Sequence, residues 1–164
     1  MNQVLDSLLI VCNGYVNKEG IQKLNKYSSN VYIRENIGFD AGAYKYILIE
    51  QKYIFQLNRY DELILFNDTC YGPIYPMDEV FQIMEARKLN FWGMTQYEDK
   101  MIKKHAQSYF LVFDKKVMQS QCFYDFWISC DTNTTNVGSI ISEFEIQITQ
   151  ALQNHGFKWG TYVD

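Results

Sequence analysis

The sequence predicts an α/β fold, in which a mostly parallel or mixed sheet is flanked by helices in three layers. Short apolar runs typical of buried strands alternate along the chain with segments of helical periodicity. The length of 164 residues, with 48% apolar and 21% charged residues, suits one globular domain. We therefore expect a single domain over residues 1–164.

The predicted strands are short apolar runs that end at turn residues. The first of them, SLLIVCN, ends at Asn13-Gly14, and the third, ELILF, runs directly into Asn67-Asp68-Thr69. The predicted strands cover residues 7–13, 30–35, 62–66, 89–95, 107–113 and 157–163.

The predicted helices carry apolar residues three or four positions apart. The last helix, 139–156, is stopped by Gly156, a residue typical of helix C-termini. Its apolar stripe consists of Ile140, Ile141, Phe144, Ile148, Ala151 and Leu152. The other predicted helices cover residues 18–27, 41–57, 77–88 and 122–128.

Composition and charge narrow the classes of partner. The net charge of −4 gives no basic surface for nucleic acid. No apolar run approaches the roughly 20 residues that a transmembrane helix needs. The four cysteines form no C-x-x-C pair, which favours free thiols and a cytoplasmic location.

The polar residues after the third strand allow two interpretations. Asn67, Asp68 and Thr69 stand at the carboxyl end of a strand, where α/β proteins bind ligands. The same residue types are common in turns, and Gly72-Pro73 follows closely. Local spacing favours the turn slightly and leaves both interpretations open.

Four stretches of the chain together carry a family resemblance. At 34–48, 60–74, 91–95 and 105–113 they read RENIGFDAGAYKYIL, YDELILFNDTCYGPI, FWGMT and HAQSYFLVF. In this order and spacing they resemble the rhamnan synthesis protein F family, bacterial glycosyltransferases that build rhamnose-containing cell-wall and surface polysaccharides. The resemblance continues through FYDFW at 123–127 and EFEIQITQALQNHGF at 143–157.

The resemblance implies a GT-A-like fold and transfer of a sugar from a nucleotide-sugar donor. By analogy the donor is dTDP-rhamnose and the acceptor a lipid-linked glycan, with the protein associated peripherally with the cytoplasmic face of the plasma membrane. The family pattern places a strand and a helix ahead of residues 5–14, so we expect this chain to lack the first strand of the fold.

For the donor site, the resemblance implies a cradle formed by the stretch RENIGFDAGAYK. Glycines at 38 and 42 permit close approach of the backbone to a ligand, and Arg34 is expected to pair with a phosphate. Asp40 is expected either to cap the following helix or to bond the donor. The expected donor-binding residues are Arg34, Asn36, Gly38, Asp40, Asn67, Thr69, His105 and Gln107.

A divalent cation is also implied by the resemblance. Asp68 matches the family's acidic motif and is expected to hold Mg²⁺ or Mn²⁺ on the donor's diphosphate, where the ion offsets developing negative charge. For His105 three functional roles stand open, as a second metal ligand, a diphosphate contact or an acceptor-site group. A structural role for this lone histidine is the alternative.

The expected catalytic residues are Asp68 and Glu145. Glu145 falls at the edge of the apolar stripe of helix 139–156, beside Ile141 and Leu152. A carboxylate at such a rim is suited to deprotonate an acceptor hydroxyl. Asp125 and Glu143 are second choices, and a solvated helix glutamate is the structural alternative.

A non-catalytic module that binds glycan or a partner enzyme is the competing function. The single carboxylate of FNDT and the expected lack of a first strand favour it. It would keep the fold and an aromatic-lined cleft without transferring a sugar.

Overall fold

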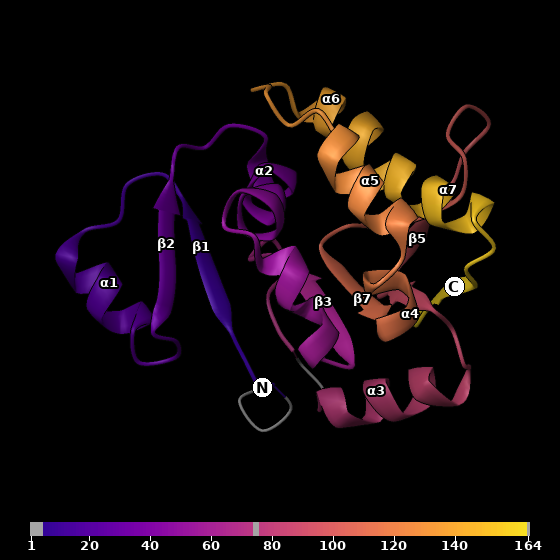
Figure 1. Cartoon of the computed structure of the whole chain (residues 1–164), viewed down its shortest axis with the longest axis horizontal. Coiled ribbons are helices and arrows are strands. Elements are labelled where there is room, and N and C mark those ends of the chain that lie inside the picture. The colour runs from indigo at the N-terminus through magenta and orange to yellow at the C-terminus, as the bar shows by residue number, and fades with distance from the viewer. Residues whose placement is uncertain (1–4, 74–75, 164) are drawn as a thin grey trace.

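The computed structural model describes residues 5–73 and 76–163, and the protein is mixed α/β (Figure 1). Among these residues the strands form one four-stranded sheet and two two-stranded sheets. The predicted class is therefore confirmed, whereas the single sheet that we expected is divided.

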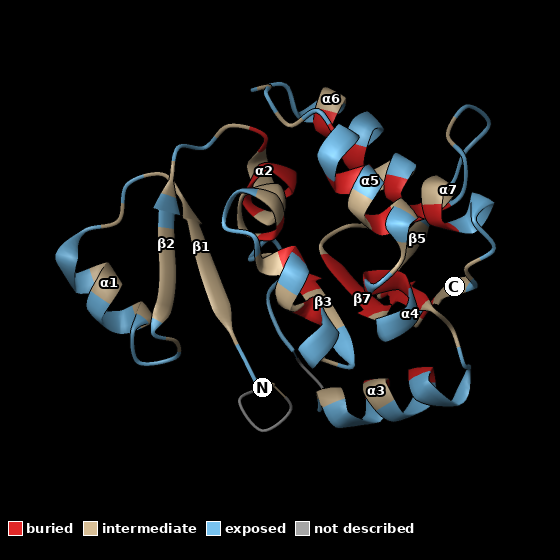
Figure 2. Ribbon diagram, viewed as in Figure 1, coloured by how far each residue is buried: buried red, intermediate tan, exposed pale blue. Residues whose placement is uncertain are grey.

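The four-stranded sheet has the order β3 (Glu62–Phe66), β7 (Phe110–Asp114), β4 (Phe91–Gly93) and β8 (Trp159–Thr161). β7 runs antiparallel to both of its neighbours, and β4 and β8 are parallel. The sheet is thus mixed. β7 occupies its middle, and four of its five residues are buried, as expected for a continuous apolar run covered on both faces (Figure 2).

The N-terminal part forms a parallel βαβ unit from β1 (Leu9–Asn13), α1 (Lys18–Leu24) and β2 (Asn30–Arg34). The side chain of Asn17 caps α1 by accepting a hydrogen bond from Gly20 N at 2.8 Å. Figure 1 shows this unit on the opposite side of α2 from the long C-terminal helix. Each predicted element of this region is confirmed.

A cleft lies between the β1–β2 sheet and the four-stranded sheet. Within the described part of the chain, β1 pairs only with β2, and β3 lies at the edge of its sheet beside β7. Residues of both β1 and β3 line the cleft between them. No strand of the described residues fills this space, so the continuous sheet of the expected three-layer fold is not formed.

The predicted helix 41–57 is wrong as a single element. The chain forms α2 (Phe39–Lys45), a π-helical turn η1 (Tyr46–Glu50) and a 3₁₀ helix η2 (Tyr53–Arg59). Lys52, with φ of 60°, lies between η1 and η2 in the left-handed region and breaks the helix. η2 buries Ile54 and Leu57, whose spacing of three matches the 3₁₀ period.

The long C-terminal helix is confirmed. It runs continuously through α6 (Val137–Ile140), a π-helical segment η3 (Ile141–Ile146) and α7 (Gln147–Asn154), and Gly156 follows with φ of 85°. It packs against α5 (Gln121–Ser129), which is predicted as 122–128. Their aromatic contacts centre on Phe123, Phe126, Trp127 and Phe144, all of them buried.

Four further elements complete the chain. α3 (Met77–Ala86) matches its prediction within two residues. The short strands β5 (Gln96–Tyr97) and β6 (His105–Ala106) pair antiparallel, and α4 (Lys115–Met118) begins at a cap formed by Asp114. These three are missed by the sequence patterns because they are two to four residues long. None of the helices formed by residues 5–73 and 76–163 has the length and apolar content that a membrane span requires.

Candidate functional site

The cleft between β1 and β3 is the concave feature that the polar site residues border. Its volume of about 2330 Å³ exceeds the roughly 300–1,000 Å³ of typical small-molecule pockets, so it is an open groove. Asn36, Asp40, Asn67, Asp68 and Thr69 all line it. These expected site residues are therefore brought together in space.

Asn67 links the two stretches that carry these residues. Its Nδ2 donates a hydrogen bond of 2.6 Å to Oδ2 of Asp40. Its Oδ1 accepts hydrogen bonds from the backbone N and the Oγ1 of Thr69, at 3.1 and 2.6 Å. The turn interpretation of FNDT is thus correct at the level of local geometry, and the same turn delivers the exposed carboxylate of Asp68 to the mouth of the cleft.

Asp40 does not cap the helix, so that alternative is wrong. The cap position of α2 belongs to Gly38, and Asp40 lies in the first turn. A carboxylate in the first turn is stabilised by the helix dipole. Asp40 accepts the hydrogen bond from Asn67 through Oδ2, and its Oδ1 takes no part in that bond.

Arg34 is engaged within the protein. Its Nη1 donates to Oδ1 of Asn13 at 2.7 Å, and its Nη2 donates to the carbonyl of Ile37 at 2.7 Å. Asn13 in turn donates from Nδ2 to the carbonyl of Phe39 at 3.0 Å. These bonds fix the loop between β2 and α2 to the end of β1. A direct phosphate contact by Arg34 would compete with them.

The glycines of the expected cradle approach protein backbone, not an open ligand space. A Cβ at Gly38 would overlap the carbonyl oxygen of Thr132, and the N–H of Gly38 donates to the carbonyl of Thr134 at 2.8 Å. A Cβ at Gly42 would overlap the carbonyl oxygen of Ile37. Both glycines are explained by packing alone.

A second polar group surrounds Glu145 in η3. Its Oε2 accepts hydrogen bonds from the backbone N and the Oγ of Ser108, at 2.7 and 2.5 Å. Its Oε1 lies 3.3 Å from Nε2 of His105. His105 is buried, and its Nδ1 lies 2.8 Å from the carbonyl oxygen of Lys103. Glu145 is therefore held by specific partners and is not a freely solvated helix residue.

The two groups share one end of the β3–β7 ladder. Asn67 donates its backbone N–H to the carbonyl of Tyr109 at 3.1 Å, and Tyr109 directly follows Ser108. Gln107 is held beside them, since its side-chain oxygen accepts a 2.8 Å hydrogen bond from Oγ1 of Thr95. Asp40 and Asn67 thus adjoin the same end of the ladder as Ser108 and Glu145.

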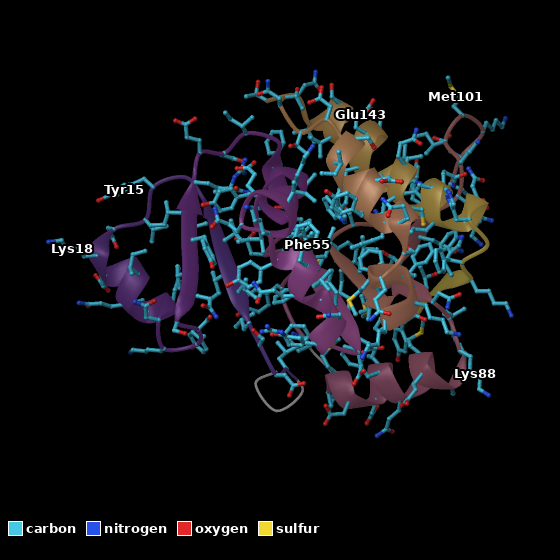
Figure 3. The ribbon with its side chains drawn as sticks, in the orientation of Figure 1. Tyr15, Lys18, Phe55, Lys88, Met101 and Glu143 are labelled. Atoms are coloured by element: carbon cyan, nitrogen blue, oxygen red, sulfur yellow. The ribbon has the colours of Figure 1, made fainter. Side chains whose placement is uncertain are left out.

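The second-choice bases have different surroundings. Glu143 is exposed and is labelled in Figure 3. Asp125 is also exposed and accepts a hydrogen bond from Gln121 at 2.8 Å. Ile141, which we placed on the buried stripe, is 41% exposed, because the π-helical segment shifts the helical register there.

Tyr44, within the predicted helix 41–57, also lines the cleft. Its ring packs against Trp127 and Phe144. Within the described residues its buried hydroxyl has no hydrogen-bond partner. Burial, together with the carboxylates of Asp40 and Asp68, raises its pKa. The helical apolar pattern around Tyr44 does not distinguish a residue of the cleft from a residue of the core.

The carboxylates of Asp40 and Asp68 fit a cation only if water and a bound substrate supply its other ligands. In the part of the chain that the structure describes, no three His, Cys, Asp or Glu side chains gather as a ligand set. Mg²⁺ commonly binds one or two carboxylates together with water and substrate phosphates. Asp68, with Asp40 beside the same turn, fits a site in which water and substrate phosphates complete the ligands of the ion.

One comparison with known proteins identifies a family. A family profile described as "Rhamnan synthesis protein F" matches residues 8–164. The chain is 28% identical over 126 residues to "Virulence protein VirA" of Vibrio anguillarum, an alignment covering 76% of this chain and 39% of that protein. It is 26% identical over 156 residues to "Uncharacterized protein y4gN" of Sinorhizobium fredii, covering 92% of this chain and 39% of that protein. The chain thus spans about two fifths of the length of these relatives. No solved structure matches it.

Proposed function

Because this chain belongs to the rhamnan synthesis protein F family, we propose that it is a nucleotide-sugar-dependent glycosyltransferase or the donor-binding core of one. A role in polysaccharide synthesis follows from the family. The finer proposal is that it transfers rhamnose from a dTDP-sugar to a lipid-linked glycan at the cytoplasmic face of the membrane.

The observation that supports this proposal best is the polar mouth of the cleft. Asp40 and Asn67, separated by 27 positions, are joined there by a 2.6 Å hydrogen bond. Asp68 projects from the same turn and is exposed. A hydrogen-bonded turn that presents a carboxylate at an open groove suits recognition of a charged ligand through a cation.

In this proposal Asp68 holds a divalent cation together with the donor's diphosphate. The cation, when bound, offsets the negative charge that develops on the departing diphosphate. Asn67 and Thr69 keep the turn in shape through their mutual bonds. Asn36 and Asp40, which line the same cleft, contact the donor beside this turn. His105 acts beside Glu145.

Glu145 is proposed as the base that deprotonates the acceptor hydroxyl. Its side chain is 17% exposed, so it is accessible at one side while its partners fix its orientation. It lies at the edge of the β3–β7 ladder that also carries Asn67. General bases of this kind contribute roughly 10²–10⁴-fold to a rate.

The metal role is tested by replacing Asp68 with its isosteric amide. Asp68→Asn is expected to weaken Mn²⁺-dependent binding of a nucleoside diphosphate at least tenfold, about 1.4 kcal/mol, as measured by titration calorimetry. Glu19→Gln is the matched control, because Glu19 is an exposed carboxylate of α1. Equal affinity of Asp68→Asn and the unmodified chain would contradict the role of Asp68.

A non-catalytic glycan- or partner-binding module is the second candidate. It is favoured by the lack of a three-residue metal-ligating group among residues 5–73 and 76–163. Such a module would bind polysaccharide fragments with an affinity that neither Mn²⁺ nor Asp68→Asn changes. A titration with oligosaccharides in place of nucleotides separates it from the transferase.

A further inference from the structure

The hydrogen bonds of His105 determine which ring nitrogen carries a proton. Nδ1 lies 2.8 Å from the carbonyl oxygen of Lys103, and a carbonyl oxygen can only accept. Nδ1 must therefore be the donor. In a neutral imidazole only one nitrogen is protonated, so Nε2 would then carry a lone pair.

That lone pair would face an acceptor. Nε2 lies 3.3 Å from Oε1 of Glu145, and an ionised carboxylate has no proton to give. Two acceptors at this distance repel each other unless a proton lies between them. Because His105 is 1% exposed, water is poorly placed to relieve that repulsion.

The remaining contacts of Glu145 decide where that proton resides. Oε2 accepts two hydrogen bonds from Ser108, one from its backbone N and one from its hydroxyl. Hydrogen bonds donated to a carboxylate favour its charged form. The proton therefore belongs on Nε2, which makes His105 an imidazolium paired with a carboxylate.

We propose that His105 and Glu145 form a buried ion pair that holds one proton on Nε2, with Ser108 and the carbonyl of Lys103 as its outer supports. In this pair His105 is a positioning residue for Glu145. Its Nε2 contacts Oε1 of the carboxylate, while Ser108 holds Oε2 at the end of the β3–β7 ladder. The ion pair does not depend on whether the protein catalyses a reaction. The role of Glu145 as a positioned base rests on the proposed function.

Lys103 and Lys104 directly precede His105 in the chain, and the elements packed against the pair add few titratable groups. β6, which carries His105, packs against β5, η3 and α7. β5 contributes Tyr97, whose ring centroid lies 6.0 Å from that of His105. η3 contributes Glu143 as well as Glu145, and α7 (Gln147–Asn154) contains no titratable side chain. Glu145 is thus the carboxylate in contact with the imidazole.

The composition of the chain makes this proposal directly measurable. It contains two histidines, and the second, His155, is exposed, with Nδ1 2.8 Å from the carbonyl oxygen of Ala151. Nitrogen NMR of the ¹⁵N-histidine-labelled chain distinguishes an imidazolium from either neutral tautomer. His155 serves as the solvent-exposed reference in the same spectrum.

At neutral pH we expect both ring nitrogens of His105 to give imidazolium shifts in the unmodified chain. Glu145→Gln should convert His105 to the neutral form with its proton on Nδ1, because an amide does not stabilise the positive charge. Glu143→Gln, two residues earlier on the exposed face, should leave the spectrum of His105 unchanged.

A neutral His105 in the unmodified chain would overturn the proposal, and so would an imidazolium that persists in Glu145→Gln. The first measurement needs no variant, so it decides even if Glu145→Gln fails to fold. The spectrum involves no nucleotide either. Loss of diphosphate binding in calorimetry would therefore count against the proposed function alone, and a neutral His105 against this pair alone.

Discussion

At the scale of single residues, most polar side chains of the candidate site already form hydrogen bonds with one another, and a few do not. Asn67 is fully used in linking Asp40 to Thr69. Asp68 remains exposed, and the hydroxyl of Tyr44 has no partner among the described residues. The group best placed to meet a ligand is therefore Asp68, because the hydroxyl of Tyr44 is buried.

Gly38 is expected to be sensitive to any side chain. Gly38→Ala should destabilise the protein by roughly 1–3 kcal/mol, because φ is 75° and a Cβ would overlap the carbonyl oxygen of Thr132. Gly156→Ala is the control, since φ there is 85° but no atom lies within 4 Å of the added Cβ. Its expected cost is about 1 kcal/mol, for the strain alone. If both variants lost the same free energy of unfolding in denaturant, the overlap with Thr132 would not contribute to the destabilisation at residue 38.

The thiols should differ in reactivity. Burial raises the pKa of Cys130 to about 11, so its reactive thiolate is scarce near pH 8, whereas Cys70 is exposed. A thiol reagent at pH 8 should modify Cys70 first and Cys130 only after unfolding. Cys70→Ser should remove the fast phase, as followed by mass spectrometry. A fast phase that survives in Cys70→Ser would contradict this assignment.

At the scale of elements, continuous apolar runs and helical periodicity predict most of the structure. ELILF forms β3 over the predicted residues, and the predicted 139–156 helix is continuous from Val137 to Asn154. The helix 41–57 is wrong because its apolar spacing continues past Lys52 while the backbone there turns left-handed. Two-residue ladders such as β5 and β6 are too short to produce a period.

The break at Lys52 can be tested directly. Lys52→Gly should stabilise the protein by about 0.5 kcal/mol, because glycine adopts positive φ without steric cost and this gain exceeds its entropic penalty. Glu50→Gly, in the preceding helical turn, should instead destabilise it by about 1 kcal/mol. Thermal or urea unfolding measures both. A destabilising Lys52→Gly would mean that the helix continues through residue 52.

At the scale of the whole molecule, the arrangement of strands is what the sequence could not predict. Pairing order depends on contacts between distant segments, and local periodicity does not contain them. The same limit applies to the site. Asp40 and Asn67 are 27 positions apart and His105 and Glu145 are 40 apart, so spacing identifies each residue type without revealing its partner. The sequence singles out Arg34 and the two cradle glycines as donor-binding residues. In the structure Arg34 hydrogen-bonds to other residues, and both glycines lie against protein backbone.

The divided sheets predict a gradient of local stability. β7 is paired on both sides, by β3 and β4, and four of its five residues are buried. β1 is paired with β2 alone among the described strands, and its five residues are half-buried. Amide hydrogen exchange should therefore be slowest in β7 and markedly faster in β1. Equal protection of the two strands would mean that the open edge of β1 is covered.

Calorimetry can show whether the polar mouth of the cleft binds a nucleotide-sugar donor through a divalent cation. The purified chain is titrated with dTDP, UDP and GDP, each with and without Mn²⁺. We expect one diphosphate to bind and its binding to require the metal, which would also name the nucleotide. A folded chain that binds none of the three, or binds one equally well without metal, would contradict that expectation.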